Sequence, residues 1–423
     1  MSRRDANEAP VRHGRQPRRS GLRTTAKVVI ASVAVLALTV VGVAAWGVAD
    51  VFGRLDRGGV SLPGNSGQPI PDVNAIEGGF NLLLVGSDSR EGQGDGFGDP
   101  KQLTGQLNDV TILVHISEDH SNATAISIPR DTFVDVPACP YPQDEDGTVP
   151  EGEQPPAGIQ KVNRTLKHGG LGCTAATVQE LTGLTVHYAG AIQFNGVTAM
   201  ANAIGGVEVC LSEPIVDPKT NLDLPAGDVT LKGETALQFL RTRYGVGDGS
   251  DLGRISNQQV YMSALMRKIL SGETLSNPVK LYKLANVAAD NMTLSTELSN
   301  ANTMVSIALA LKGMPTENIT FVKYPTGSGM LNGQEGEIPV EADAAALLDA
   351  VKADRSLSIT GGTGEYGAVP KDGDSTEPPA DDGETTPPED DATAPPSADG
   401  PVELPDSVKG QTAADETCSN GNG

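Results

Sequence analysis

Positive charge is scarce in this chain of 423 residues. It has 31 lysines and arginines against 54 aspartates and glutamates, which gives a formal net charge of −23 at pH 7. A general nucleic-acid-binding protein needs a basic surface to neutralise phosphates and to displace counterions. The shortage of positive charge therefore argues against DNA or RNA as a partner, and it makes any local group of arginines more informative.

Cysteines are also few, and no two of the four are spaced as C-x-x-C, so a structural zinc site is not expected. Cys139 and Cys173 flank a loop rich in proline, glycine and acidic residues, where a disulfide would suit an oxidising exterior. Cys210 lies in an apolar, strand-like segment and fits a buried thiol equally well, and Cys418 lies near the C-terminus. The sequence does not choose among the three possible pairings.

Charge is absent from residues 28–49, a run of 22 residues. Such a run is long enough to cross a bilayer core of about 30 Å as a helix. Residues 1–27 carry eight lysines and arginines against two acids, which favours a cytoplasmic N-terminus. A cleaved signal peptide is the alternative, because Ala44, Ala45 and Ala49 leave a cleavage site open. We favour a single transmembrane helix over 28–49 that anchors the chain in the cell membrane, with the rest of the chain extracytoplasmic.

Two further segments lack the features of a packed domain. Residues 50–75 are rich in glycine, proline and aspartate and are interpreted as a linker. Residues 354–423 form an acidic, proline-rich tail without an aromatic residue after Tyr366, and we predict that this tail is disordered. The intervening residues 76–353 are then the extracytoplasmic domain.

Residues 76–353 contain no internal repeat and mix two kinds of apolar pattern. Strands are predicted at 80–86, 110–116, 123–128, 186–193, 207–211 and 319–324. Helices are predicted at 174–182, 197–204, 276–289, 296–312 and 341–353. This mixture predicts a single α/β domain with one central sheet.

An arginine-rich stretch, residues 241–254, lies between two helical patterns. Arg241, Arg243 and Arg254 are separated by glycines that allow the backbone to turn sharply. Converging guanidinium groups bind phosphate well, because each offers paired donors that match two oxygens. The alternative is a solvated cluster of ion pairs with Asp248 and Asp251.

Polar side chains also follow the predicted strands, where functional groups of α/β proteins commonly lie. Together with the arginine-rich stretch they form a set of six cations and three carboxylates. The set comprises Asp88, Arg90, Asp109, Arg130, Asp131, Lys161, Arg241, Arg243 and Arg254. Cations that neutralise phosphate oxygens, and carboxylates that hold Mg²⁺, are the groups that a pyrophosphate site requires.

Six blocks of this sequence, in their order, resemble the LytR-CpsA-Psr family of bacteria. They are NLLLVGSDSR (81–90), AISIPRD (125–131), KVN (161–163), GGVEV (205–209), LPAG (224–227) and RTRY…DLGRI…Q (241–258). The chain also has the basic arm and single anchor that are usual in the family. The insertion at residues 139–158 resembles relatives from high-GC Gram-positive bacteria, that is, an actinobacterial type.

The resemblance implies a mixed central sheet flanked by helices, with a deep apolar tunnel for a polyprenyl chain. It implies a phosphotransferase that moves a glycan phosphate from a polyprenyl-pyrophosphate carrier to a peptidoglycan hydroxyl. By motif, Asp88 and Asp109 would hold Mg²⁺ (or Mn²⁺), and Asp88 is also a candidate base for the acceptor hydroxyl. The pyrophosphate would be bound by Arg90, Arg130, Arg241, Arg243, Arg254 and Gln258. Asp131 would orient Arg130, and Lys161 would assist at the phosphates.

Two positions depart from the family pattern. Leu107-Asn108-Asp109 stands where relatives often have Arg-Ser-Asp, and Asn257 stands where they often have arginine. This chain therefore has fewer cations near the predicted site than many relatives. Two alternative functions stay open: a polyprenyl-pyrophosphate phosphatase or pyrophosphatase, and a non-catalytic scaffold that binds the lipid pyrophosphate. A membrane-bound transcription regulator is disfavoured, because a 27-residue arm is too short for a DNA-reading fold.

Overall fold

A computed structural model describes eleven stretches of the chain. These are residues 59–64, 78–89, 106–142, 150, 152–271, 284, 287–288, 290–299, 301–363, 368–371 and 400–422. The predicted anchor at 28–49, the arm at 1–27, most of the linker and Arg90 lie outside them, as does most of the helix predicted at 276–289. None of the described helices combines the length and apolarity that a membrane-spanning helix requires.

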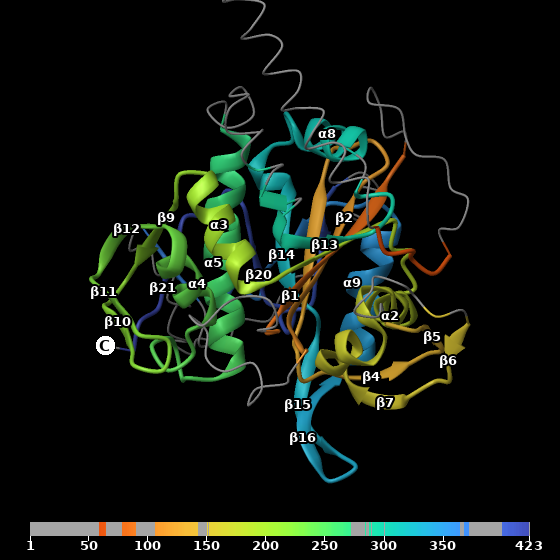
Figure 1. Cartoon of the computed structure of the whole chain (residues 1–423). Coiled ribbons are helices and arrows are strands. Elements are labelled where there is room, and N and C mark those ends of the chain that lie inside the picture. The colour runs from red at the N-terminus through yellow and green to blue at the C-terminus, as the bar shows by residue number, and fades with distance from the viewer. Residues whose placement is uncertain are drawn as a thin grey trace, which may run out of the picture. The chain divides into compact units, whose positions relative to one another are not determined.

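A seven-stranded mixed sheet forms the centre of the described fold (Figure 1). Its strands, in spatial order, are β13 (Met292–Leu294), β8 (Tyr188–Ile192), β1 (Phe80–Ser87), β2 (Asn108–Ile116), β3 (Ala123–Ile128), β14 (Ile319–Lys323) and β20 (Gly410–Thr412). β1 runs antiparallel to β2 and parallel to β8, and β3 runs parallel to β14. The predicted class, an α/β domain with one mixed central sheet, is therefore confirmed.

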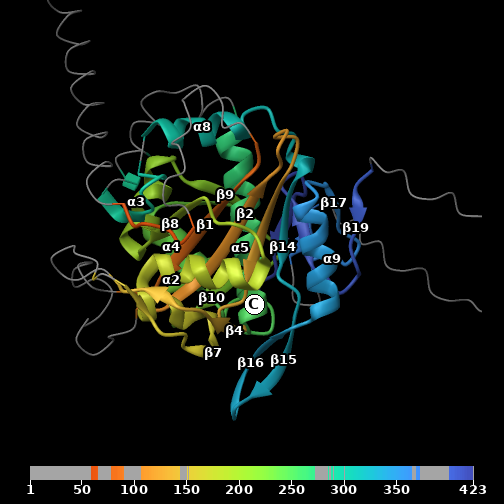
Figure 2. The same cartoon turned by 90° about the vertical axis from the view of Figure 1, so that its right-hand side faces the viewer.

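Helices cover both faces of this sheet (Figures 1 and 2). Alternate residues of a strand point to opposite faces. Leu83 and Val85 accordingly pack in one core cluster with residues of α2 (Thr165–Thr182) and α9 (Glu341–Lys352). Leu82 and Leu84 pack against a second cluster, which includes Ile307 of α8 (Ala301–Leu311), and residues of α5 (Asp251–Leu270) also pack against this cluster.

A smaller sheet lies beside the central one and carries a third core cluster. Its order is β12 (Gly227–Leu231), β9 (Val207–Leu211), β21 (Thr417–Ser419) and β18 (Val369–Pro370). Helices α3 (Phe194–Ala203), α4 (Gly233–Arg241) and α5 are neighbours of this part of the fold (Figure 1). Strand pairs β10 (Ile215–Asp217) with β11 (Leu222–Leu224), and β15 (Thr326–Leu331) with β16 (Gln334–Pro339), form separate hairpins.

Helix α2 begins earlier than the predicted residue 174, and two glycines explain why. Gly169 and Gly170 have non-helical backbone angles, so a short helical segment and the predicted helix join across a kink. Only hydrogen fits at Gly169, because a Cβ there would lie 2.6 Å from the Pro140 carbonyl oxygen and from the Cys173 Cβ. The helix ends at Gly183 in the left-handed conformation, as predicted from the sequence.

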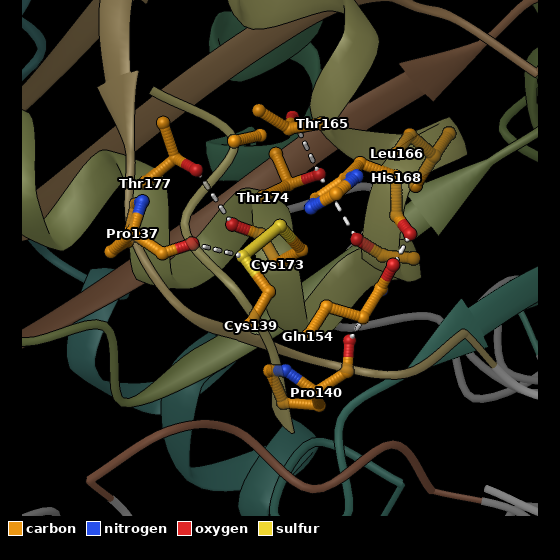
Figure 3. Close-up of a disulfide and its surroundings, with 12 residues drawn as sticks. Pro137, Cys139, Pro140, Gln154, Thr165, Leu166, His168, Cys173, Thr174 and Thr177 are labelled. Carbon is orange, nitrogen blue, oxygen red and sulfur yellow. Dashed lines mark hydrogen bonds between the residues drawn. A yellow bond between two sulfur atoms is a disulfide. The ribbon is translucent and has the colours of Figure 1, made fainter. Parts of the chain in front are cut away.

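The kink lets a hairpin pack against α2. The hairpin consists of β5 (Cys139–Pro140) and β6 (Glu153–Gln154), and a disulfide joins its Cys139 to Cys173 of α2 (Figure 3). Gln154 strengthens this junction, because its Nε2 donates to the carbonyls of His168 at 2.7 Å and Pro140 at 3.3 Å. Nearby, β4 (Phe133–Val136) pairs with β7 (Gly158–Lys161), which leads through the 3₁₀ turn Val162–Arg164 into α2.

The C-terminal residues correct the sequence analysis. The prediction that 354–423 is disordered is wrong for residues 354–363, 368–371 and 400–422. Residues 369–370 and 417–419 contribute β18 and β21 to the smaller sheet, and residues 410–412 contribute β20 to the central one. Cys418 forms a disulfide with Cys210, so Cys210 is not a free buried thiol. The acidic composition of the tail predicted disorder, but the tail contains apolar side chains that are buried in the structure, among them Leu404, Val408 and Ala413.

Candidate functional site

A β-bulge marks the site at one end of the central sheet. Gly86 of β1 pairs with Val110 of β2, but the next residue, Ser87, pairs with Asn108. Asp109 is therefore the extra residue between two regular pairs. Bulges of this kind bend a strand and redirect a side chain, and they are common beside active sites.

Asp109 joins three elements through its side chain and its backbone. Its carboxylate accepts a hydrogen bond of 2.7 Å from Nη1 of Arg130, which follows β3. Its carbonyl oxygen accepts one of 3.1 Å from Nη2 of Arg254, in the first turn of α5. Two arginines that are far apart in the sequence therefore meet at the bulge.

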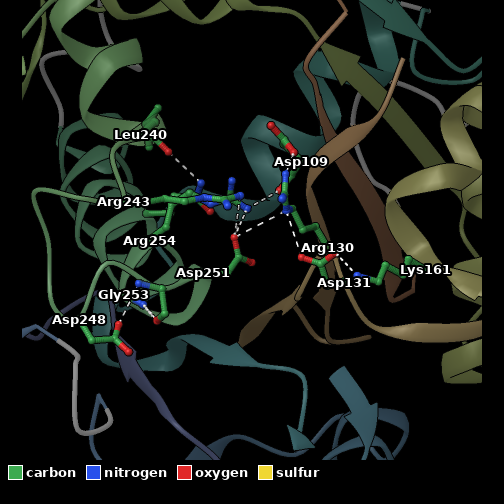
Figure 4. Close-up of polar contacts among 12 residues, drawn as sticks. Asp109, Arg130, Asp131, Lys161, Leu240, Arg243, Asp248, Asp251, Gly253 and Arg254 are labelled. Atoms are coloured by element: carbon green, nitrogen blue, oxygen red, sulfur yellow. Dashed lines mark hydrogen bonds and ion pairs between the residues drawn. The ribbon is translucent and has the colours of Figure 1, made fainter. Parts of the chain in front are cut away.

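Asp251 draws three guanidinium groups together (Figure 4). Its Oδ1 lies 2.7 Å from Nη2 of Arg254, 3.1 Å from Nη2 of Arg243 and 3.9 Å from Nε of Arg130. These contacts are ion pairs without hydrogen-bond geometry, because neither carboxylate oxygen of Asp251 has a hydrogen-bond partner. The carboxylate thus occupies a position among three cations that a phosphate oxygen could also take.

Burial makes Arg254 the most enclosed of these arginines. Its side chain is 5% exposed, against 25% for Arg130 and 28% for Arg243. Burial lowers the pKa of the Arg254 guanidinium, and the negative charge of Asp251 opposes this change. Arginine remains charged at physiological pH even so, which makes this a fixed positive charge inside the domain.

The loop between α4 and α5 is held by Asp217 of β10. The buried carboxylate of Asp217 accepts a hydrogen bond of 2.6 Å from Thr242 Oγ1 and one of 3.2 Å from the Arg243 backbone N–H. Arg241 is the last residue of α4, and Thr242 after it has an extended backbone, so the chain leaves the helix in the extended manner expected from the sequence. Arg241 lies over the ring of Phe194 at 4.3 Å, a cation–π contact.

These groups border a cavity of about 500 Å³. That volume lies within the range of roughly 300–1,000 Å³ that is usual for ligand pockets. Its charged and amide lining includes Asp109, Arg130, Arg241, Arg243, Arg254 and Gln258. Its apolar lining comes from the sheet and from α3, α4 and α5, and includes Leu84, Ile112, Val197, Ile204, Leu237, Leu240, Met262 and Leu265. The cavity therefore combines a cluster of cations with an apolar interior.

Asp131 and Lys161 flank Arg130 on its other side. The Asp131 carboxylate accepts hydrogen bonds from Lys161 Nζ at 2.9 Å and from Arg130 Nε at 3.3 Å. Burial raises the pKa of Asp131, but the Lys161 hydrogen bond and the charges of both cations outweigh it, so the pKa is lowered overall. Lys161 thus contacts the site through Asp131, and Asp131 is placed to orient Arg130.

Asp88 supports the loop that leads to the bulge. Its Oδ1 accepts a hydrogen bond of 2.7 Å from the Leu107 backbone N–H, and its own N–H donates to the Leu107 carbonyl at 3.0 Å. Asp88 and Asp109 belong to adjacent strand ends. Their hard oxygen atoms suit Mg²⁺, which commonly binds one or two carboxylates together with substrate phosphates. No group of three or more potential metal ligands occurs among the described residues, so phosphate oxygens would have to complete such a site.

Comparison with known proteins decides the family. The model of the LytR_cpsA_psr family matches residues 64–353, well over half of the chain. The chain belongs to the LytR_cpsA_psr family. The family membership predicted from the six sequence blocks is therefore confirmed.

Individual relatives in this family cover most of the described domain. The cell wall biosynthesis protein LcpA of Corynebacterium glutamicum is 33% identical over 339 residues, a match that spans 74% of this chain but only 62% of LcpA. The polyisoprenyl-teichoic acid–peptidoglycan teichoic acid transferase TagT of Bacillus subtilis is 25% identical over 326 residues, which span 75% of this chain and 92% of TagT. Protein gbs0355 of Streptococcus agalactiae shares the fold, with a TM-score of 0.51 at 23% identity over 66% of this chain and 88% of that one.

The structure accounts for one of the two departures from the LytR_cpsA_psr pattern. Asn257 is 2% exposed; it donates a hydrogen bond of 2.7 Å to the Phe239 carbonyl and accepts one from Ser419 of the C-terminal segment. Position 257 therefore faces the docked tail, and its lack of charge removes no cation from the cavity. Gln258, the next residue, lines the cavity and donates to the Leu240 carbonyl at 2.9 Å.

Sequence reasoning missed three contributors to the site. Asp251 was considered only as part of a solvated cluster, whereas it lies among three arginines. Asp217 and Phe194, which contact Arg243 and Arg241 respectively, were not considered at all. No local pattern could have found Asp217, because its partners lie 25 and 26 residues away.

Proposed function

We propose that this chain is an anchored phosphotransferase that moves a glycopolymer from a polyprenyl-pyrophosphate carrier to peptidoglycan. The single observation that carries the proposal is the convergence of Arg130, Arg243 and Arg254 on one carboxylate oxygen beside an apolar cavity. A lipid pyrophosphate has the complementary form, an anionic head on an apolar chain. The names of LcpA and TagT, a cell wall biosynthesis protein and a teichoic acid transferase, support the same assignment.

In the proposed reaction, the oxygen of an acceptor hydroxyl attacks the phosphorus that bears the glycan. The bond from that phosphorus to the bridging oxygen breaks, so the glycan phosphate passes to the acceptor and polyprenyl phosphate leaves. Arg130, Arg243 and Arg254 stabilise the charge that develops on the phosphate oxygens, which is the main requirement of phosphoryl transfer. Asp131 holds Arg130 in place, and Asp88 is the proposed acceptor of the hydroxyl proton.

Asp109 and Asp88 are the residues that would hold Mg²⁺ or Mn²⁺. The ion would neutralise phosphate charge when bound. Because Asp109 already pairs with Arg130, the chain's own contribution is to keep carboxylate and guanidinium side by side at the bulge. The transmembrane anchor at 28–49 belongs to the same proposal and would hold the domain beside its lipid substrate.

The test is a transfer assay with the full chain in detergent or vesicles, supplied with a polyprenyl-pyrophosphate-linked glycan and peptidoglycan. The wild type should form a phosphodiester-linked product and release polyprenyl phosphate, and Arg130→Ala should reduce the rate by at least roughly a hundredfold. Asp135→Ala, on an exposed residue of β4, is the matched control and should keep the rate. Release of lipid phosphate without transfer to the acceptor would replace the proposal with a hydrolase, and no turnover by the wild type would reject catalysis.

A further inference from the structure

A second cavity, of about 730 Å³, lies next to the first and plays no part in the proposed binding of the pyrophosphate. Ser87, at the end of β1, and Gln193, which follows β8, border both cavities. Because β1 and β8 are parallel neighbours, these two residues lie at the same edge of the sheet. The two cavities therefore approach one another beside the bulge that carries Asp109.

The chemistry of the two cavities differs. The described residues around the first include four arginines, whereas those around the second include one charged side chain, Glu153. The second cavity has uncharged polar groups, among them Ser87, Ser89 and Gln106, together with apolar residues such as Leu166 and Leu171. A phosphate would find few partners there, but a neutral, polyhydroxylated molecule would find many.

An aromatic ring is also available at the second cavity. Tyr141 lines it and is 36% exposed, so its ring is accessible to a ligand. An aromatic ring with a polar hydroxyl combines apolar contact with hydrogen bonding, a combination that suits the face of a sugar ring. Tyr141 lies only two residues beyond Cys139, so the disulfide to α2 anchors it.

The wall of this cavity is held firmly. Gly169, Pro140 and Leu171 line it at the junction where the Cys139–Cys173 disulfide fastens the hairpin to α2 (Figure 3). Gln154 adds hydrogen bonds to both sides of that junction, through the carbonyls of Pro140 and His168. A preformed wall lowers the entropy lost on binding.

We infer that the second cavity is the acceptor site and that it binds the neutral amino-sugar backbone of peptidoglycan. This inference rests on the proposed function, because transfer between two large substrates needs two sites that meet at the reacting phosphate. The shared border at Ser87 and Gln193 provides that meeting point. The arginine-lined cavity takes the donor, and the Tyr141 cavity presents the hydroxyl to it.

Direct binding tests the inference without turnover. The probe is a disaccharide of N-acetylated amino sugars, titrated into the full chain and followed by calorimetry or by NMR. We expect Tyr141→Ala to weaken binding roughly tenfold, Tyr141→Phe to retain most of it, and Ile159→Ala, at another exposed apolar residue, to leave it unchanged. All three variants change exposed side chains, and thermal unfolding confirms that each folds.

Separate outcomes distinguish this inference from the proposed function. If the disaccharide does not bind the wild type, or binds Tyr141→Ala equally well, the acceptor site is elsewhere even where the transfer assay succeeds. If binding depends on Tyr141 but no glycan is transferred, the cavity remains a sugar site and the phosphotransferase proposal fails. In an active enzyme, Tyr141→Ala should raise the KM for acceptor and leave the KM for donor unchanged.

Discussion

Replacing Asp251 with asparagine would leave three guanidinium groups facing one another without their shared carboxylate. Asp251 Oδ1 lies 2.7, 3.1 and 3.9 Å from nitrogen atoms of Arg254, Arg243 and Arg130. Removing one partner of a buried ion pair commonly costs about 3–5 kcal/mol of folding free energy. Because the Asp251 side chain is 20% exposed, solvent screens part of its interaction with the arginines. We therefore expect the substitution to lower the free energy of unfolding by about 2–3 kcal/mol.

Thermal unfolding measures this effect. A loss of that size should lower Tm by roughly 5–10 °C in a domain of more than 200 residues. Asp248→Asn is the matched control, because Asp248 is exposed three residues before Asp251 and its carboxylate accepts a hydrogen bond of 2.9 Å from the Ser250 N–H. The control should shift Tm by less than about 2 °C.

Inorganic pyrophosphate should then discriminate between the two variants. In the wild type, the anion competes with the Asp251 carboxylate for the three arginines. In Asp251→Asn that competitor is gone, so pyrophosphate should bind roughly tenfold more tightly and raise Tm further than in the wild type. The reasoning is refuted if Asp251→Asn is as stable as Asp248→Asn, or if pyrophosphate binds the two variants with equal affinity.

Three other predictions concern the disulfides, the cavity and a buried phenol. Replacing Cys210 and Cys418 with serine should lower the free energy of unfolding by about 5 kcal/mol, and replacing Cys139 and Cys173 should lower it by about 4 kcal/mol, because the disulfides close loops of 208 and 34 residues. Equal losses in denaturant titrations would contradict this chain-entropy argument. Val197→Trp should obstruct the apolar cavity, so a short prenyl pyrophosphate should bind more weakly while inorganic pyrophosphate binds as before. An equal loss of affinity for both ligands would show that the cavity does not hold the prenyl chain. Burial raises the pKa of Tyr261 to about 12, so stability should be lost as the pH rises from 10 towards 12, and the ultraviolet titration step near 12 should be absent from Tyr261→Phe.

Much of the central sheet could be predicted because its strands are local, apolar and bounded by turns. The strands predicted at 80–86, 123–128 and 319–324 correspond closely to β1, β3 and β14. Hairpin β15–β16 was missed, because its alternating glycines and acidic residues do not form an apolar pattern. The tail was misjudged for a different reason: few of its residues are apolar, and a distant disulfide fixes them.

The site could be predicted in part, since its arginines follow strands or lie in a glycine-rich loop. Arg130, Arg241, Arg243 and Arg254 were predicted to act together, and the structure places all four around one cavity. The bulge at Asp109 could not be predicted from the sequence, because a bulge depends on how two strands pair rather than on either strand alone. The roles of Asp217 and Asp251 depend in the same way on contacts between separate elements.

The most direct test of the central claim is a crystal structure of the domain with a bound prenyl pyrophosphate. The account predicts electron density for the pyrophosphate within hydrogen-bonding distance of Arg130, Arg243 and Arg254, and for the prenyl chain among the apolar residues of α3, α4 and α5. Pyrophosphate bound away from these arginines, or a prenyl chain outside the cavity, would contradict it.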